Sequence, residues 1–132
     1  MPILIDGWNL IRDDKSDISD DDCDSIESAT HLIMYLAGFQ KRHRDPITVV
    51  FDSSRGFLDI EHTNTDTLSL VAVKDADRYI RSYIEKTPER QRPGMRVVSS
   101  DKAIYYYVRS LNAAAVTSGE FWDKLRSSRH RA

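Results

Sequence analysis

Ile3-Leu4-Ile5-Asp6 is a short apolar run that ends in an acidic residue, and the recurrence of this pattern decides the fold. It returns three times: in Ile47–Phe51 with Asp52, in Leu68–Val73 with Asp75 and Asp77, and in Met95–Ser99 with Asp101. Apolar, β-branched runs of this length are typical of strands buried on both faces. We therefore predict a strand at each run, with acidic residues at or just beyond these strand ends.

Amphipathic segments separate the predicted strands. Apolar residues recur at helical spacing over residues 20–43, 76–84 and 103–111, which predicts three helices. A last helix is expected over residues 117–125, because Thr117-Ser118-Gly119-Glu120 is a capping box. A fifth, short strand is expected just before it, at residues 113–116.

The alternation of strands and helices predicts the fold class. It indicates an α/β protein with a mostly parallel sheet of about five strands, covered by helices on both faces. Within this sheet we take Leu68–Val73 as the central strand and residues 57–61 as a short strand-like excursion. Pro46 is expected to end the helix over residues 20–43.

Length and composition indicate one soluble domain. The chain has 132 residues and a mass of 15.2 kDa, enough to bury roughly two thirds of its unfolded surface. We expect the domain to span residues 1–126, with a basic tail over 127–132. The single cysteine, Cys23, excludes an internal disulfide and favours a reducing, cytoplasmic location. No signal peptide and no membrane association are expected, since no apolar run approaches the roughly 20 residues of a membrane span.

The charge is unevenly distributed along the chain. The formal net charge is -2, but residues 1–66 carry 14 acids and 6 bases, whereas residues 67–132 carry 7 acids and 13 bases. The net charge is therefore -8 for the first half and +6 for the second. A net charge of this size excludes a strongly basic coat for nucleic acid, yet the second half retains positive charge for a local phosphate-binding face.

The strand-end acids predict a metal site. The carboxyl ends of parallel strands share one edge of a sheet, so these side chains can converge in one crevice. Clustered carboxylates repel one another unless a hard cation joins them, and oxygen ligands favour Mg²⁺ or Mn²⁺. Such an ion activates water and stabilises charge on a phosphoryl group, which predicts hydrolysis of a phosphoester. The alternative role for each acid is a helix cap, and for Asp75 the cap is the favoured interpretation.

The segment Ile5-Asp6-Gly7-Trp8-Asn9-Leu10-Ile11 resembles the signature of the NYN domain, a PIN-like ribonuclease superfamily. Val49–Asp52, Asp75–Ile80 and Val97–Asp101 look like the later acidic motifs, and Thr117–Leu125 looks like the closing helix of the bacterial YacP-like branch. The likeness covers essentially the whole chain. It implies a three-layer α/β/α PIN-like sandwich and a metal-dependent endoribonuclease that hydrolyses RNA phosphodiester bonds.

The resemblance also implies which residues form the site. Mg²⁺ or Mn²⁺ would be held by Asp6, Asp52, Asp77 and Asp101. Asn9 would be a neutral member that holds a water or a phosphate oxygen. Ser100, in preference to Ser99, would bond a ligand or cap the helix that follows.

Two positions depart from the family pattern. Trp8 stands where the family usually has Tyr, and we expect it to pack in the core. Arg78 stands where many relatives have a second acid, which leaves the number of metal ions open.

Basic residues beside the strand-end acids are candidate contacts for RNA phosphates: Arg12, Arg55, Lys74, Arg78 and Lys102. Tyr107, within Tyr105-Tyr106-Tyr107, is expected to pack in the core. RNA is the expected partner, and a ribosome or an inhibitory protein are further candidates. The alternative function is a catalytically inactive PIN-like module that binds RNA or another protein, with RNA affinity independent of metal.

Overall fold

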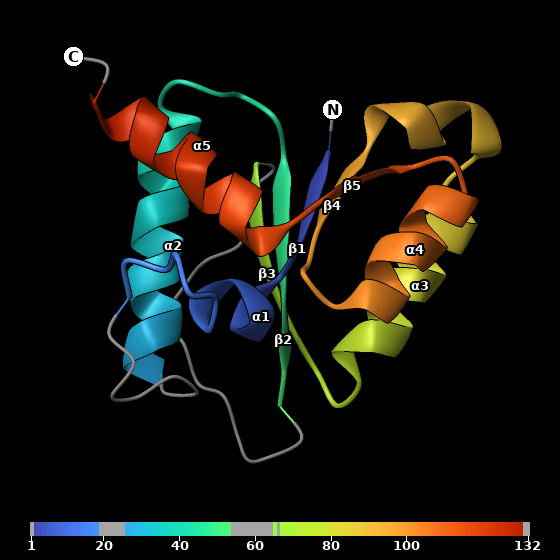
Figure 1. The fold of residues 1–132 in the computed structure, drawn as a ribbon, viewed down its shortest axis with the longest axis horizontal. Coiled ribbons are helices and arrows are strands. Elements are labelled where there is room, and N and C mark those ends of the chain that lie inside the picture. Colours follow the sequence, from blue (N-terminus) through green and yellow to red (C-terminus); the bar gives the residue numbers. More distant parts are fainter. Residues whose placement is uncertain (1, 19–25, 54–64, 66, 131–132) are drawn as a thin grey trace.

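A five-stranded, entirely parallel sheet forms the centre of the molecule (Figure 1). The structure is a computed structural model that describes residues 2–18, 26–53, 65 and 67–130. The strands are β1 (Ile3–Asp6), β2 (Ile47–Asp52), β3 (Leu68–Val73), β4 (Arg96–Val98) and β5 (Ala114–Val116), in the spatial order β3-β2-β1-β4-β5. The predicted α/β class and the parallel sheet are confirmed.

Helices cover both faces of the sheet. They are α1 (Gly7–Ile11), α2 (Ile26–Gln40), α3 (Ala76–Lys86), α4 (Lys102–Ser110) and α5 (Ser118–His130), with a 3₁₀ helix at Glu89–Gly94. In Figure 1 the sheet is seen edge-on, with α1, α2 and α5 on one side and α3 and α4 on the other. The three-layer α/β/α arrangement is therefore present.

The alternation of side chains along each central strand explains why the apolar runs are continuous. Ile3 and Ile5 of β1 pack into the core under α2 and α5, whereas Leu4 packs into the core under α3 and α4. In β2, Val49 and Phe51 join the first core and Val50 the second. A strand covered on both faces needs an apolar residue at every position, because successive side chains point to opposite faces.

Two expectations about the strands and helices are wrong. Leu68–Val73 is an edge strand, since β3 pairs only with β2, and the central place belongs to β1, which lies between β2 and β4. The helix expected over residues 20–43 ends at Gln40, before the polar residues that lead to Pro46. The amide groups of Arg42 and His43 then bond back to the Phe39 carbonyl and close the helix in a turn.

Other boundaries differ in detail. The short helix α1 was not expected, because five residues are too few for a periodic signal. Helix α5 continues through His130, past the expected domain boundary at residue 126. The capping box at its start is confirmed, since Thr117 and Glu120 exchange backbone-to-side-chain hydrogen bonds. The expected excursion at residues 57–61 lies outside the described residues.

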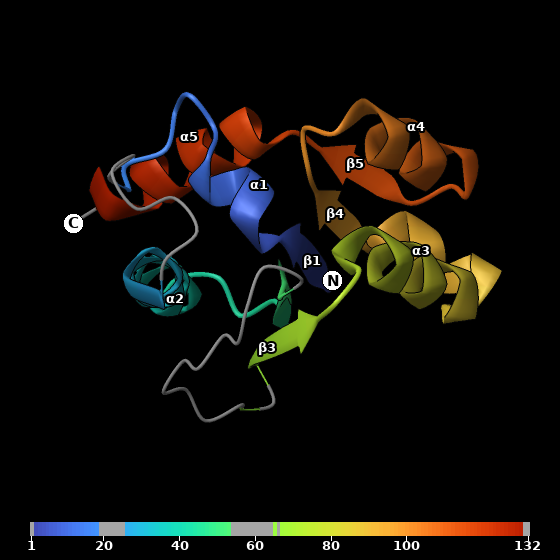
Figure 2. The same ribbon diagram turned by 90° about the horizontal axis from the view of Figure 1, so that it is seen from below.

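The topology creates a switch point between β1 and β4. From β1 the chain passes through α2 to β2 and β3 on one side, and α3 then carries it back to β4 and β5 on the other. In parallel sheets ligands bind beyond the carboxyl ends of the strands at such a point. Figure 2 views the molecule from the side on which these strand ends lie. Within the described ranges, no helix is both long and apolar enough to cross a membrane.

Candidate functional site

Asp6 lies at the switch point. It is the last residue of β1, the central strand, and its carboxylate oxygen Oδ2 accepts a hydrogen bond from the Ser99 hydroxyl at 3.3 Å. Ser99 follows β4 directly and is 2 % exposed, so the contact joins the ends of the two strands that flank the switch point. The bond engages one of the two carboxylate oxygens of Asp6.

The pKa of Asp6 is raised from its ordinary 3.8 to about 6. Burial is the main cause, because a desolvated carboxylate is less stable than the neutral acid. The charges of Asp101 and Asp77 raise it further, whereas the Ser99 hydroxyl and the backbone N–H of Asn9 oppose the shift. Asp6 is therefore a half-buried acid whose environment disfavours negative charge, which is the condition that a bound cation would relieve.

Asp101 is a helix cap, one of the two roles that the sequence analysis considered for the strand-end acids. Its Oδ1 accepts hydrogen bonds from the amides of Ala103 and Ile104, so it caps α4. The Asp101 amide in turn donates to the Ser99 hydroxyl oxygen at 3.2 Å. Oδ2 makes no hydrogen bond to the residues that the structure describes, so the cap leaves one oxygen for a ligand.

Asp77 lies in the first turn of α3, and its side chain is 51 % exposed. Its Oδ1 accepts a hydrogen bond from Arg81 Nε at 2.9 Å, one helical turn away. Asp75, two residues earlier, accepts from the Arg78 amide and caps α3. The prediction that Asp75 is a helix cap is therefore confirmed.

Asn9 stands at the centre of a hydrogen-bond network beside Asp6. Its Oδ1 accepts from the Ser100 amide at 2.8 Å and from the Ser118 hydroxyl at 2.7 Å, and the Ser118 amide donates to Ser100 Oγ at 2.9 Å. The network ties α1, the loop after β4 and the start of α5 together. The Asn9 amide nitrogen makes no hydrogen bond to any described residue, so it is a donor available to a ligand.

Asp52 lies farther from this group. It ends β2 two residues beyond Val50, the register partner of Asp6, and its charge is not one of those that act on the pKa of Asp6. Its backbone carbonyl accepts from Trp8 Nε1 at 2.7 Å. Trp8 itself is buried and packs on Phe51, as expected for a core residue.

The residues fit a divalent cation that keeps much of its water. Among the described residues, no three His, Cys, Asp or Glu side chains are close enough to form a ready-made metal cage. The charges of Asp77 and Asp101 nevertheless act on Asp6, and Asp77 and Asp101 each retain one carboxylate oxygen that makes no hydrogen bond to a described residue. Mg²⁺ usually binds through one or two carboxylates and retains several waters, so this sparse set of oxygens suits it.

Four of the predicted RNA contacts lie at the same edge of the sheet. Arg12 follows α1, Lys74 follows β3, and Arg78 and Lys102 lie in the first turns of α3 and α4; all four are exposed. Arg55 lies outside the described residues. No ion pair between Asp6 and these four cations is present among the described residues.

Two contacts at the site were not expected from the sequence, and one expected core residue lies elsewhere. The bond of Ser99 to Asp6 was not expected, and the role predicted for Ser100 towards a ligand stays a prediction. Ser118 joins Asn9, which no sequence pattern indicated. Tyr107 is half-buried, not a core residue, and carries the guanidinium of Arg81 on its ring. The Asp77–Arg81 spacing of four residues was a readable signal for an ion pair.

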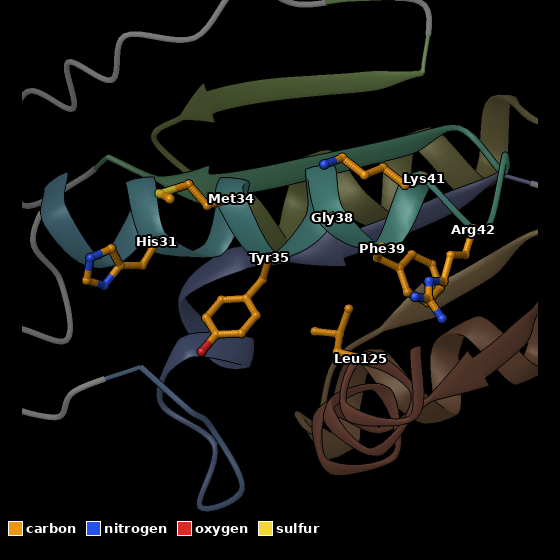
Figure 3. A pocket seen from close by; sticks show the side chains of 8 residues that line it. All are labelled: His31, Met34, Tyr35, Gly38, Phe39, Lys41, Arg42 and Leu125. Atoms are coloured by element: carbon orange, nitrogen blue, oxygen red, sulfur yellow. The ribbon is translucent and has the colours of Figure 1, made fainter. Parts of the chain in front are cut away.

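A separate groove of about 510 Å³ lies between α2 and α5 (Figure 3). Tyr35, Phe39 and Leu125 provide its apolar surface, and Lys41 and Arg42 lie at its end. The groove runs along α2 from His31 to Arg42. None of the predicted site residues lines it, so the groove is not the site of the acids.

Comparison with known proteins identifies relatives of the chain. A family described as the YacP-like NYN domain matches residues 3–132. The crystal structure of Rae1 (YacP) from Bacillus subtilis is 20 % identical, with a TM-score of 0.74, over 99 % of this chain and 76 % of that one. Its W164L mutant gives 20 % identity and a TM-score of 0.73 over 98 % and 77 %. No curated protein matches.

Proposed function

Because the chain belongs to the YacP-like NYN domain family, we propose that it is a metal-dependent endoribonuclease that hydrolyses RNA phosphodiester bonds. Family and fold support a nuclease-type function related to RNA. The observation that carries the finer proposal is the position of Asp6. It is a half-buried acid at the switch point, with the charges of Asp77 and Asp101 acting on it and with a pKa of about 6.

Asp6, Asp77 and Asp101 are the proposed ligands of Mg²⁺ or Mn²⁺, and Asp52 is a peripheral member. When bound, the ion would supply activation of water and stabilisation of charge on the phosphoryl group. The proposed ligand atoms are the carboxylate oxygens that do not take part in the Ser99 bond, the Arg81 bond or the α4 cap. Their fixed partners hold each carboxylate in place before a ligand arrives.

The neutral and basic residues have separate proposed roles. Asn9 is held by its oxygen, so its free amide nitrogen can donate to a phosphate oxygen without adding negative charge. Ser100 fixes the start of α5 by accepting from the Ser118 amide. The exposed cations Arg12, Lys74, Arg78 and Lys102 are proposed to hold the RNA backbone by charge, which makes binding dependent on salt.

The test is cleavage of a labelled single-stranded RNA in Mg²⁺ or Mn²⁺, with EDTA as the metal-free arm. Asp6→Asn and Asp101→Asn are expected to slow cleavage at least about a hundredfold. Asp101→Asn keeps α4 capped, because Asn is as good a cap as Asp. Asp75→Asn is the matched control: it also keeps its cap, lies near the site, and should cut at the normal rate.

A contaminating nuclease would cut equally in all preparations, so equal rates in the two site variants and the wild type would refute the proposal. The second candidate, an inactive RNA-binding module, gives a different pattern. It predicts no cleavage under any condition, together with RNA binding that depends on salt and not on metal.

A further inference from the structure

Arg81 is a cation beside the acids that the sequence analysis did not select. It lies in α3 one turn after Asp77, and its Nε donates to Asp77 Oδ1 at 2.9 Å. The face of its guanidinium lies over the Tyr107 ring of α4, with Cζ 4.6 Å from the ring centroid. Two contacts from two helices therefore fix both the edge and the plane of the guanidinium.

Tyr107 is itself held in place. Its hydroxyl donates a hydrogen bond to the carboxylate of Glu85, which lies one turn beyond Arg81 on α3. The arrangement thus runs from Asp77 through Arg81 and Tyr107 to Glu85, alternating between α3 and α4. A guanidinium held in this way loses little further side-chain freedom when it binds an anion.

The Arg81 guanidinium has further N–H groups that can donate hydrogen bonds to a ligand. Of its nitrogens only Nε is engaged with Asp77, and neither Nη atom makes a hydrogen bond to a described residue. The Arg81 side chain is 35 % exposed, so solvent and ligands reach it. Two parallel N–H groups of a guanidinium match two oxygens of a phosphate, which is the reason that arginine is preferred at phosphate sites.

The negative charges of the candidate site also act on Arg81. Its pKa is raised by the hydrogen bond to Asp77 and by the negative charges of Asp77 and Asp101. A phosphate that approaches these acids meets their repulsion first, and a fixed cation on the same edge offsets it. Arg109, which lies over Tyr105 in the last turn of α4, shares the stacked arrangement but has no described acidic partner.

We propose that Arg81 is a substrate-binding residue, which takes a backbone phosphate of the RNA next to the acids while Tyr107 and Asp77 keep it aimed. This inference rests on RNA being the substrate under the proposed function, but it does not require metal or cleavage. The alternative is that Arg81 only joins α3 to α4.

RNA binding in EDTA distinguishes these roles, because no cleavage occurs to obscure it. The probe is a fluorescent single-stranded RNA of about 12 nucleotides, titrated at several salt concentrations. We expect Arg81→Ala to weaken binding about five- to tenfold. We also expect the slope of log affinity against log salt to fall by about 0.7, as for the loss of one phosphate contact to a single strand. Arg109→Ala should leave both affinity and slope unchanged.

The tyrosine provides a second, independent arm. Tyr107→Phe keeps the ring under Arg81 and should bind RNA as the wild type does. Tyr107→Leu removes the ring and should weaken binding, with the salt slope preserved because the cation remains. Arg81→Lys should likewise keep the slope but lose affinity, since an ammonium lacks the planar pair of donors.

The outcomes are separable from those of the proposed function. Wild-type affinity and slope in Arg81→Ala would overturn the inference, as would a wild-type protein that does not bind the RNA in EDTA. A lower melting temperature with unchanged RNA binding would assign Arg81 to the joining of α3 and α4. If the wild type never cuts RNA, yet Arg81→Ala weakens binding and lowers the slope, the inference stands and only the nuclease proposal fails.

Discussion

The hydroxyl of Ser99 donates a hydrogen bond to the carboxylate of Asp6 across 3.3 Å, joining the carboxyl ends of β4 and β1. The same hydroxyl oxygen accepts from the Asp101 amide, so one buried side chain touches two candidate metal ligands. Because the bond to Asp6 favours its ionised form, Ser99 opposes the effect of burial on the pKa of Asp6.

Ser99→Ala should therefore raise the pKa of Asp6 above about 6 and cost about 1 to 2 kcal/mol of stability, because the Asp101 amide loses its partner. The measurement is the pH dependence of RNA cleavage, whose acid limb should move to higher pH. Ser100→Ala is the control, since Ser100 makes no described bond to Asp6. An acid limb that stays at its wild-type position in Ser99→Ala would contradict this role.

The raised pKa of Asp6 also predicts how stability depends on pH. The folded protein holds a proton on Asp6 more tightly than the unfolded chain, so stability falls as the pH rises from about 4 to about 6. The full penalty, of order 2 to 3 kcal/mol, applies above that range. Asp6→Asn carries no such charge and should be more stable than the wild type at pH 7 to 8.

Urea unfolding in EDTA across pH 4 to 8 measures this difference. The stability of Asp6→Asn relative to the wild type should grow through the window and then level off. A difference that is constant with pH would show that Asp6 titrates at its ordinary value when folded.

Divalent ions should offset the loss of stability that the charge of Asp6 causes. If Mg²⁺ or Mn²⁺ binds at Asp6, a concentration of 100 times its Kd should add about 2.7 kcal/mol to the stability of the wild type. The rise in melting temperature should be absent in Asp6→Asn. It should be retained in Asp75→Asn, because Asp75 caps α3 and is not one of the proposed metal ligands. Equal rises in all three proteins would place the ion elsewhere.

The parts of the fold that follow from local chemistry could be predicted from the sequence. The runs around Ile5 and Val49 have to be strands buried on both faces, and the capping box at Thr117 marks the start of α5. The central place of β1 could not be predicted in this way, because it depends on which side each crossover takes. Leu68–Val73 is apolar enough for a central strand, yet it lies at the edge.

In the candidate site, too, some features could be predicted from the sequence and others could not. The acids could be found because strand ends and parallel pairing bring them to one edge. The bond of Ser99 to Asp6 and the contact of Asn9 with Ser118 could not be predicted, because they join residues 93 and 109 positions apart. Arg81 was within reach, because its spacing from Asp77 is that of a helical ion pair.

The contact of Asn9 with Ser118 predicts a structural rather than a chemical effect. Ser118 is fully buried, and Ser118→Ala removes the hydroxyl that bonds Asn9 but keeps the backbone amide that bonds Ser100. The expected cost is about 1 kcal/mol, measured by urea unfolding, with the pKa of Asp6 unchanged. A shift in the acid limb of the cleavage profile in this variant would instead place Ser118 in the electrostatics of the site.

Gly7 explains why the site begins with an Asp-Gly pair. A Cβ at Gly7 would lie 2.5 Å from Cε1 of Phe51, a buried ring on β2, so only glycine lets α1 begin directly after Asp6. Gly7→Ala should therefore destabilise the protein by about 1 to 3 kcal/mol and displace α1 with Asn9 on it. Gly38→Ala in α2 is the matched control: no atom lies within 4 Å of its Cβ, and it should stabilise the protein by about 0.5 to 1 kcal/mol. Thermal unfolding of the two variants gives opposite signs if the close contact is real, and a neutral Gly7→Ala would mean that Phe51 has room to move aside.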